Sequence, residues 1–451
     1  MPLSVKTRPK TKPAVAAKPA AAPPVVAVAP SAWPRRRVAV VVQRYGEGLL
    51  GGAEWHAASL IEALATQHEV TVLTSCARDA MSWAMHYLPG ESIEGGVRVR
   101  RFAHPPRNEG GRAKVPLRHK LRFLAAPLLD ALKRTRVVKP SGDDRLDGHE
   151  FLRRQGPRCE GLIDALKHGH DAFDAVIFFT ALYHPTAEGL PAWGRKSVLV
   201  PTLHDEKAMH LPVFHRVFGG AGHILWNTAA EQRLALRLYG ESARGPGSVV
   251  GAAVRTMPPW SAQVAQARQR YGLPARYVVY VGRVEIGKGC AELLAAWRAL
   301  GPRVADAALI FVGQGGMKIA ESPNVRLTGF IDPGERDALV AGAAALVMPS
   351  RHESLSLVLL EAMALGVPVL ANGRCEPLAD HVAASGAGES YGNSRELLDG
   401  LLRALARDEA ARTKLGHAGK DYVFANYGPD IVKRRWLQAV EQVCQQAAPA
   451  P

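Results

Sequence analysis

Short apolar runs alternate with longer stretches in the first half of the chain, and the longer stretches carry apolar residues at helical spacing. Residues 35–45 form an apolar run of strand length, residues 53–67 have helical periodicity, and residues 68–75 form a second strand-like run. A strand, a helix and a strand within about 40 residues are typical of a βαβ unit with a parallel sheet. Further strands are predicted at 96–102, 174–180, 197–204 and 223–228.

The same alternation starts again after a segment rich in Gly and Pro at 240–247, which we interpret as a hinge. Strands are predicted at 248–254, 277–283, 307–315, 325–330, 345–350 and 368–373, with helices at 290–300 and 355–366. We therefore expect an α/β protein of two doubly wound, Rossmann-like domains facing across a cleft, with ligands at the carboxyl ends of the strands. The predicted domains are 37–247 and 248–425. A closing helical segment, 426–451, could pack on either domain.

Length, charge and cysteine content are consistent with this organisation. A chain of 451 residues is longer than one core usually fills. The formal net charge is +16, but eight cations lie in the first 37 residues, which contain no acid. Residues 1–36 are therefore predicted to be a disordered basic tail rich in Ala and Pro, and the folded part is less basic. The five cysteines form no CxxC pair, which indicates a reducing cytoplasm.

A second basic stretch, residues 112–139, mixes cations with Val, Leu and Phe. Two interpretations stay open: a helix that lies on an anionic membrane or guides an anionic acceptor, and a solvated helix with an apolar inner face. The longest apolar run, residues 338–348, is about half the length of a membrane span. We expect a cytoplasmic protein, which under the first interpretation associates peripherally with the cytoplasmic face of the inner membrane.

Three segments look like nucleotide or metal sites, but each is better explained in another way. Residues 282–289 have the glycine and lysine spacing of a P-loop, yet Gly289 stands where that loop needs a hydroxyl for Mg²⁺. Residues 46–51 have the GxGxxG form of a dinucleotide site, yet the following strand ends in Thr74 and Ser75 instead of an acid. Residues 142–148 are rich in Asp, and a solvated loop explains them better than a metal site.

Residues 351–370 carry the strongest chemical signal. A predicted strand ends just before Glu353, and a helix capped by Ser354 or Ser356 then carries Glu361 about one and a half turns along. Both carboxylates can accept hydrogen bonds from sugar hydroxyls of one ligand, and the amino end of the helix offers unpaired amides to phosphate. Glu361 lies among apolar residues, where a charge without a partner is costly. These features together favour a binding site over a solvated helix face.

The spacing of Glu353 and Glu361 resembles the paired-glutamate signature of retaining glycosyltransferases of family 4, which have the GT-B fold. Similar to the same family are VGRxxxxKG at 281–289, GGAE at 51–54 and HDE at 204–206. The segments 43–46, 76–83 and 153–157 look like a bacterial branch that acts in surface-polysaccharide assembly. The resemblance extends from Val38 to about Trp436.

The resemblance implies a role for each matching residue. Arg283 and Lys288 bind the two phosphates of a nucleotide sugar, for which a guanidinium fork and an ammonium are chemically suited. Glu361 holds the ribose hydroxyls, and Glu353 binds hydroxyls of the transferred sugar. The other implied residues are the backbone amides of Leu355, Ser356 and Leu357 near the phosphates, Gly51 and Gly52, which leave room for the diphosphate and the acceptor, and His204 near the reacting face of the donor sugar.

The implied reaction moves a hexose-type sugar from a GDP- or UDP-linked donor to a hydroxyl of a glycan or lipid-linked acceptor. The anomeric configuration is retained, no metal or cofactor is needed, and the catalytic residues are His204, Arg283, Lys288 and Glu353. Ser354, Leu355 and Ser356 stand where Gly, Phe and Gly are frequent in the family. This departure leaves the identity of the donor sugar open.

Other functions explain less of the sequence. A sugar-nucleotide epimerase or a phosphorylase could use the same fold, and a phosphorylase would need a lysine that anchors pyridoxal. A nucleic-acid-binding protein fits the charge alone, because no basic helix with interleaved aromatic residues is predicted. His204, His210 and His215 do not have the spacing of a metal-binding pair on one helix face. We therefore expect neither a metal nor a nucleic-acid partner.

Overall fold

The computed structural model describes residues 34–49, 51–80, 82–106, 143–256 and 258–447. The basic stretch 112–139 and most of the predicted tail lie outside these residues. The end of the predicted tail is structured, because Arg36 Nη2 lies 2.7 Å from Glu441 Oε1 and a strand begins at Arg37. The prediction of disorder is therefore wrong for Arg36, whose guanidinium is held by a buried carboxylate.

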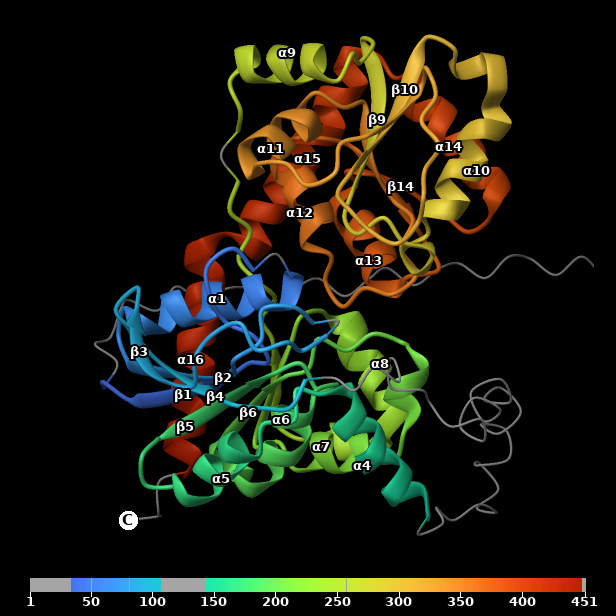
Figure 1. Ribbon diagram of the computed structural model, residues 1–451. Helices are drawn as coiled ribbons and strands as arrows, with labels where there is room; N and C mark the ends of the chain where they lie inside the picture. The colour runs from blue at the N-terminus through green and yellow to red at the C-terminus, as the bar shows by residue number, and fades with distance from the viewer. Residues whose placement is uncertain (1–33, 50, 81, 107–142, 257, 448–451) are drawn as a thin grey trace, which may run out of the picture. The chain divides into compact units, whose positions relative to one another are not determined.

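Eight strands form the first sheet, in the order β3-β4-β2-β1-β5-β6-β7-β8 (Figure 1). Their bounds are β1 Arg37–Val41, β2 Glu69–Ser75, β3 Gly90–Glu94, β4 Val97–Phe102, β5 Ala175–Phe179, β6 Ser197–Val200, β7 His223–Trp226 and β8 Gly247–Val249. Neighbouring strands are parallel except for β3 and β4. The central strand β1 pairs with β2 and β5, and its residues 38–41 are fully buried. Its apolar run thus has the pattern of a strand covered on both faces.

The helices of this domain are α1 Gly52–Ala65, α4 Asp143–Gln155, α5 Glu160–His168, α6 His184–Gly189, α7 Val213–Gly219 and α8 Ala229–Tyr239. Two predictions are wrong here. The strand predicted to reach residue 204 ends at Val200, because Pro201 has no N–H to donate and Thr202 has a left-handed φ of 48°. The loop predicted at 142–148 is helical from Asp143 onward.

Six parallel strands form the second sheet, in the order β11-β10-β9-β12-β13-β14. The strands are β9 Arg276–Val281, β10 Ala307–Val312, β11 Val325–Leu327, β12 Ala345–Met348, β13 Val369–Asn372 and β14 Gly388–Tyr391. The helices are α9 Ser261–Arg270, α10 Cys290–Leu300, α11 Pro333–Ala341, α12 Leu357–Ala364, α13 Glu376–Ser385, α14 Ser394–Ala406 and α15 Glu409–Tyr427. Two Rossmann-like domains are therefore confirmed. One strand differs, since residues 247–249 pair with β7 in the first sheet instead of starting the second domain.

The last helix, α16 Pro429–Ala447, packs on the first domain (Figure 1). Trp436 is buried together with residues of β1, β5 and β6, and its ring stacks on His56 of α1 with centroids 5.7 Å apart. Burial lowers the pKa of His56 to about 4, so this contact is made by a neutral imidazole. This packing answers the question that the sequence left open. None of the described helices combines the length and apolar character needed to cross a bilayer.

Close packing of α15 holds α12, the helix that carries Glu361, in place. A Cβ atom at Gly416 would collide with the carbonyl oxygen of Gly366, and one at Gly419 would lie 3.2 Å from Met363 Cβ. The two glycines therefore let the backbones of α15 and α12 approach more closely than larger residues would allow.

Candidate functional site

Two strand-end loops of the second domain bring Lys288 and Glu353 together. Because β9 and β12 are neighbouring parallel strands, the loops that follow them meet at the same edge of the sheet. Lys288 Nζ lies 2.8 Å from Glu353 Oε1, and the two side chains are 27% and 17% exposed. The structure therefore joins two residues that are 65 positions apart and that were identified separately from the sequence.

Gly289, which does not fit the P-loop pattern, allows the loops after β9 and β12 to approach each other closely. Gly289 has a φ of +80°, and a Cβ at this position would collide with the carbonyl group of Pro349 at the end of β12. A serine or threonine would suffer both the left-handed backbone and this collision. Gly289 is therefore explained by the contact between the two loops.

Arg283 lies in the same loop as Lys288 but is far more exposed. Its side chain is 63% exposed, and Nη1 lies 3.3 Å from Glu285 Oε1. An exposed ion pair of this kind stabilises a fold by about 1 kcal/mol at most. The guanidinium can therefore leave Glu285 for an anionic ligand at small cost.

Glu361 faces a residue that the sequence analysis missed. Its side chain is 15% exposed, and Oε2 lies 3.5 Å from Nη1 of Arg336 on α11. Burial raises the pKa of Glu361 to about 7, and the positive charge of Arg336 acts in the opposite direction. The neighbouring Asp337 accepts two hydrogen bonds from Arg336 and fixes its guanidinium. No spacing in the sequence points to Arg336, because its role depends on α11 lying beside α12.

The amino end of α12 is built differently from the prediction. Ser356 occupies the N-cap position, with φ 68° and ψ 73°, but its side chain makes no capping hydrogen bond. Ser354 is held by two residues that follow β7: Thr228 Oγ1 donates to the Ser354 carbonyl over 3.0 Å, and Asn227 Nδ2 lies 3.3 Å from Ser354 Oγ. The predicted serine cap is therefore wrong for Ser356, since the left-handed backbone turns its side chain away from the amides of the first turn.

A buried histidine fixes the residue before this turn. His381 Nε2 lies 3.0 Å from the carbonyl oxygen of Leu355, and Nδ1 lies 2.8 Å from the hydroxyl of Tyr422. Burial lowers the pKa of His381 to about 4, so the ring is neutral. Nε2–H then donates to Leu355 and Nδ1 accepts from Tyr422, which sets the tautomer. This residue too was not identified from the sequence.

Substitution of Ser356 by glycine should stabilise the second domain. A left-handed backbone costs a non-glycine residue about 1–2 kcal/mol. Glycine also increases the conformational entropy of the unfolded chain, which lowers the stability by about 0.5–1 kcal/mol. The relief of strain is the larger effect, so we expect the free energy of unfolding to rise by about 0.5–1 kcal/mol. Chemical denaturation measures this change. The control is Ser390→Gly in strand β14, which should lower the stability, and a loss of stability in Ser356→Gly would contradict the strain.

His204 lies in the loop after β6, four residues beyond the end of the strand. Its side chain is 34% exposed, Nδ1 lies 3.7 Å from Glu206 Oε1, and its ring centroid lies 6.2 Å from that of His352, the neighbour of Glu353. Asp205 pairs with His210 over 2.8 Å, and the hydrogen bond from His210 lowers the pKa of Asp205. Among the described residues, no group of three or more His, Cys, Asp or Glu side chains could hold a metal ion.

Gly51 and Gly52 stand at the start of α1. A Cβ at Gly51 would collide with the carboxylate of Glu54, whereas the space around a Cβ at Gly52 is open. Glu54 is buried and accepts hydrogen bonds from Gln43 Nε2 at 2.9 Å and from Arg44 Nη2 at 2.6 Å. Glu54, the acidic residue of the GGAE motif, therefore lies directly beneath Gly51 and is fixed there by Gln43 and Arg44.

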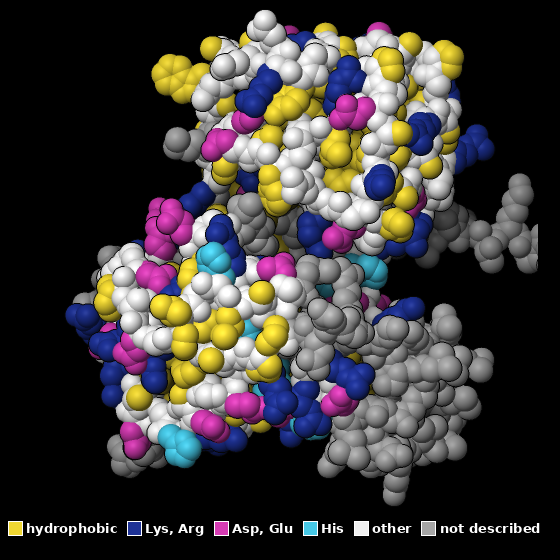
Figure 2. Space-filling model, viewed as in Figure 1, with side chains coloured by type: hydrophobic (Ala, Val, Ile, Leu, Met, Phe, Trp, Pro, Cys, Tyr) yellow, Lys and Arg dark blue, Asp and Glu magenta, His cyan; other side chains and the backbone are white. Residues whose placement is uncertain are grey.

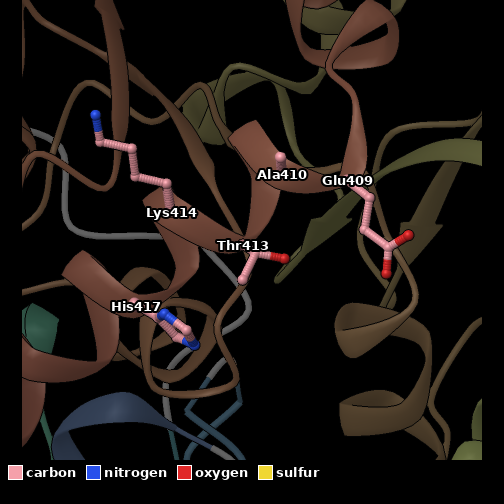
Figure 3. Close-up of a pocket in the computed structure, with 5 residues that line it drawn as sticks. All are labelled: Glu409, Ala410, Thr413, Lys414 and His417. Atoms are coloured by element: carbon pink, nitrogen blue, oxygen red, sulfur yellow. The ribbon is translucent and has the colours of Figure 1, made fainter.

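The surface offers two further observations. A shallow hollow of about 710 Å³ lies along α15 and is lined by Glu409, Ala410, Thr413, Lys414 and His417. Figure 3 shows Lys414 and Glu409 extending away from each other, so they do not converge on one ligand.

On the face seen in Figure 2, the basic side chains of the described residues are mixed with acidic ones. The described residues on this face form no continuous basic stripe of the kind that binds nucleic acid.

Part of the second domain matches a known family. Residues 275–407 match the family model described as Glycosyl transferases group 1. A curated relative, the phosphatidyl-myo-inositol mannosyltransferase of Propionibacterium freudenreichii, is 32% identical over 161 residues, which are 34% of this chain and 42% of the relative. The D-inositol 3-phosphate glycosyltransferase of Acidothermus cellulolyticus is 26% identical over 377 residues, which are 77% of each chain. The chain spans 31% to 53% of the length of the first three curated relatives that it matches.

Solved structures match almost the whole chain. The structure of Anabaena HepE in complex with UDP and glucose superposes with a TM-score of 0.63 at 15% identity, covering 90% of this chain and all of that one. At this identity the likeness concerns the fold. Residues 275–407 are therefore similar to the glycosyl transferases group 1 family, and the chain as a whole has the GT-B fold.

Proposed function

We propose that this protein is a retaining glycosyltransferase that moves a hexose-type sugar from a GDP- or UDP-linked donor to a hydroxyl of a glycan or lipid-linked acceptor. The observation that carries the proposal is the ion pair of Lys288 and Glu353, which places a cation for phosphate beside a carboxylate for sugar hydroxyls. The names of the relatives support it, since they are mannosyl- and glycosyltransferases, and the HepE structure holds UDP and glucose. We further propose that the enzyme works in the cytoplasm, in bacterial polysaccharide biosynthesis.

The donor would enter the site by separating the Lys288–Glu353 pair. The diphosphate then forms an ion pair with Lys288 and a second one with the exposed Arg283. Hydroxyls of the sugar donate hydrogen bonds to the carboxylate of Glu353 in place of Lys288. Each charged group exchanges one partner for another, so binding leaves neither of them buried without a partner. As the bond to the leaving diphosphate breaks, negative charge builds on its oxygens, and the two cations stabilise that charge.

The remaining residues would orient the two ends of the donor. Glu361 accepts hydrogen bonds from the ribose hydroxyls, and backbone amides of residues 355–357 point at the phosphates, with the Leu355 carbonyl held by His381. His204 lies near the reacting face of the sugar. Gly51 and Gly52 leave room for the diphosphate and the acceptor, and the space beside Gly52 is open. In this arrangement the protein's own cations neutralise the diphosphate, so we expect transfer to continue in the presence of EDTA.

The proposal is tested by a melting-temperature screen against UDP, GDP, ADP and their sugars, because a ligand that binds only the native state raises the melting temperature. We expect a UDP or GDP compound to stabilise the protein and the matching sugar nucleotide to support transfer to a glycan or lipid-linked acceptor. If none of these nucleotides raised the melting temperature, the assignment of the site would be wrong.

Donor affinity should depend on pH through Glu361. A carboxyl with a pKa of about 7 is mostly protonated at pH 6 and mostly ionised at pH 8, and the ionised form is the better acceptor for ribose hydroxyls. Affinity for the nucleoside diphosphate should therefore rise by about tenfold over this range. Isothermal titration calorimetry at both values measures the change.

Two variants separate this effect from other titrating groups, including the phosphates of the ligand. Glu361→Gln cannot ionise, so its affinity should lack the part of the pH dependence that belongs to Glu361. Arg336→Gln removes a charge that lowers the pKa of Glu361, so the midpoint should move to higher pH. An identical pH dependence in the wild type and in Glu361→Gln would rule out this role of the carboxylate.

A further inference from the structure

The first domain contains a buried carboxylate that the proposed mechanism does not use. Glu231 lies in the first turn of α8 and is 1% exposed. Its Oε2 accepts a hydrogen bond from the backbone N–H of Asn227 and its Oε1 accepts one from the backbone N–H of Leu203, each over 2.5 Å. No ion pair of Glu231 occurs among the described residues. The side chain therefore joins the loops that follow two neighbouring strands, β6 and β7.

Helix capping explains only one of these two hydrogen bonds. In α8, Thr228 caps the N–H of Glu231, and the carboxylate of Glu231 reaches back to the residue before the cap. Helix α14 has the same arrangement, in which Asn393 caps the N–H of Glu396 and Glu396 Oε2 accepts from Gly392 N–H over 2.6 Å. The second oxygen of Glu396, however, bonds to the side chain of its own cap, Asn393, and Glu396 is exposed. The link from Glu231 to another strand is thus additional to capping.

Burial makes this link costly. Removal from water raises the pKa of Glu231 to about 8, against the effect of the backbone N–H groups that it accepts from. An exposed capping residue, such as Glu396, would serve the helix without this cost. The burial of Glu231 is accounted for by its second contact, since Leu203 N–H lies inside the protein, next to β6 and β7.

The loop that receives the second bond leads directly to His204. Thr202 has a left-handed φ of 48°, which is a strained conformation for a β-branched residue. Such a backbone persists only where the surrounding structure fixes it. The bond from Leu203 N–H to Glu231 fixes the peptide that joins Thr202 to Leu203, immediately before His204. The direction in which His204 leaves the loop therefore depends on Glu231.

We propose that Glu231 is a positioning residue that holds the His204 loop in the geometry needed for sugar transfer, an inference that rests on the proposed function. Glu231 itself touches neither the donor nor the acceptor. It acts through the backbone, so its loss should misplace His204. Arg283, Lys288 and Glu361, with which Glu231 makes no hydrogen bond or ion pair, should keep their positions.

The test compares Glu231→Gln with the matched control Glu396→Gln. The amide has only one oxygen that can accept a hydrogen bond. Its NH₂ group would face one of the two backbone N–H donors, so one of the two hydrogen bonds is lost. In Glu231→Gln we expect kcat at saturating donor to fall by about tenfold or more, while the Kd for UDP or GDP stays within about twofold of the wild type. In Glu396→Gln both values should stay within about twofold, although the same capping bond is altered. Equal kcat values in the two variants would overturn the proposal.

Two further measurements distinguish positioning from a general loss of structure. In a His204→Ala background, Glu231→Gln should change kcat by less than about twofold, because the residue through which it acts is gone; a full, additive loss contradicts the proposal. The NMR resonances of the His204 imidazole, measured without substrate, should shift in Glu231→Gln and not in Glu396→Gln. This readout needs no glycosyl transfer, so it still decides the proposal if the wild type transfers no sugar, a result that would refute only the proposed function. If Glu231→Gln does not fold, Glu231→Asp, which keeps a carboxyl group but not both bonds, takes its place in all three measurements.

Discussion

Substitution of Lys288 by alanine is expected to lower kcat/KM for the nucleotide sugar by about 10²–10³-fold, comparable to the loss of one donor that stabilises transition-state charge. Lys288 Nζ lies 2.8 Å from Glu353 Oε1, and in the proposed mechanism its ammonium meets the leaving diphosphate. The variant loses that charge and also leaves the carboxylate of Glu353, 17% exposed, without its cation. Steady-state kinetics with the donor identified by the melting-temperature screen measure the change.

Two variants make this result specific. Lys414→Ala removes a positive charge from α15, in the hollow of Figure 3, and should leave kcat/KM at the wild-type value. The double variant Lys288→Ala, Glu353→Ala should lose less than the sum of the two single losses, because residues in direct contact are not additive. Lys288→Ala with wild-type kcat/KM would show that the β9 loop is not the diphosphate clamp.

Substitution of His204 by alanine is expected to lower kcat by about 10²-fold while the Kd for the free nucleotide changes little. The reason lies in the position of His204, which follows β6 in the first domain, whereas Arg283, Lys288 and Glu361 belong to the second domain. A residue near the reacting face of the sugar contributes mainly after the donor is bound. Single-turnover transfer and calorimetry with the nucleotide measure the two quantities separately.

The control for this variant is His417→Ala, which removes an exposed imidazole from α15 and should change neither quantity. If His204→Ala weakened nucleotide binding as strongly as it lowered kcat, His204 would be a donor-binding residue instead. If it changed nothing, the loop after β6 would have no part in transfer, and the role inferred for Glu231 would also be lost.

Much of the architecture could be predicted from the sequence because burial leaves a regular pattern. The runs at 38–42 and 345–348 are apolar throughout, since those strands are covered on both faces of a parallel sheet. The helix predicted at 290–300 is α10, Cys290–Leu300, whose amino end is marked by glycine and whose apolar residues face one side. The break at Gly428 and Pro429 likewise separates α15 from α16.

The predictions that failed concern contacts between segments distant in the sequence. Residues 247–249 have the pattern of a strand, but nothing in their sequence indicates which sheet they join. Their pairing with β7 places them in the first sheet. The short edge strand β3 was not predicted, because its five residues are exposed or half-buried and show no apolar pattern. The packing of α16 on the first domain includes the stacking of Trp436 on His56, 380 residues earlier in the chain.

For the candidate site too, some of the residues could be predicted from the sequence, whereas the contacts between them could not. Local periodicity and turn residues set where each strand stops. The fold class could therefore be predicted from the sequence, and so could the places of Arg283, Lys288, Glu353 and Glu361 on loops and a helix at strand ends. Only the tertiary structure showed that Lys288 pairs with Glu353 and that Gly289 is required by the approach of Pro349. The contacts of Arg336 with Glu361, of His381 with Leu355 and of Glu231 with Leu203 likewise appear only in the folded chain. Each of these residues acts on a partner far along the chain, and such a partner leaves no periodic trace in the sequence around it.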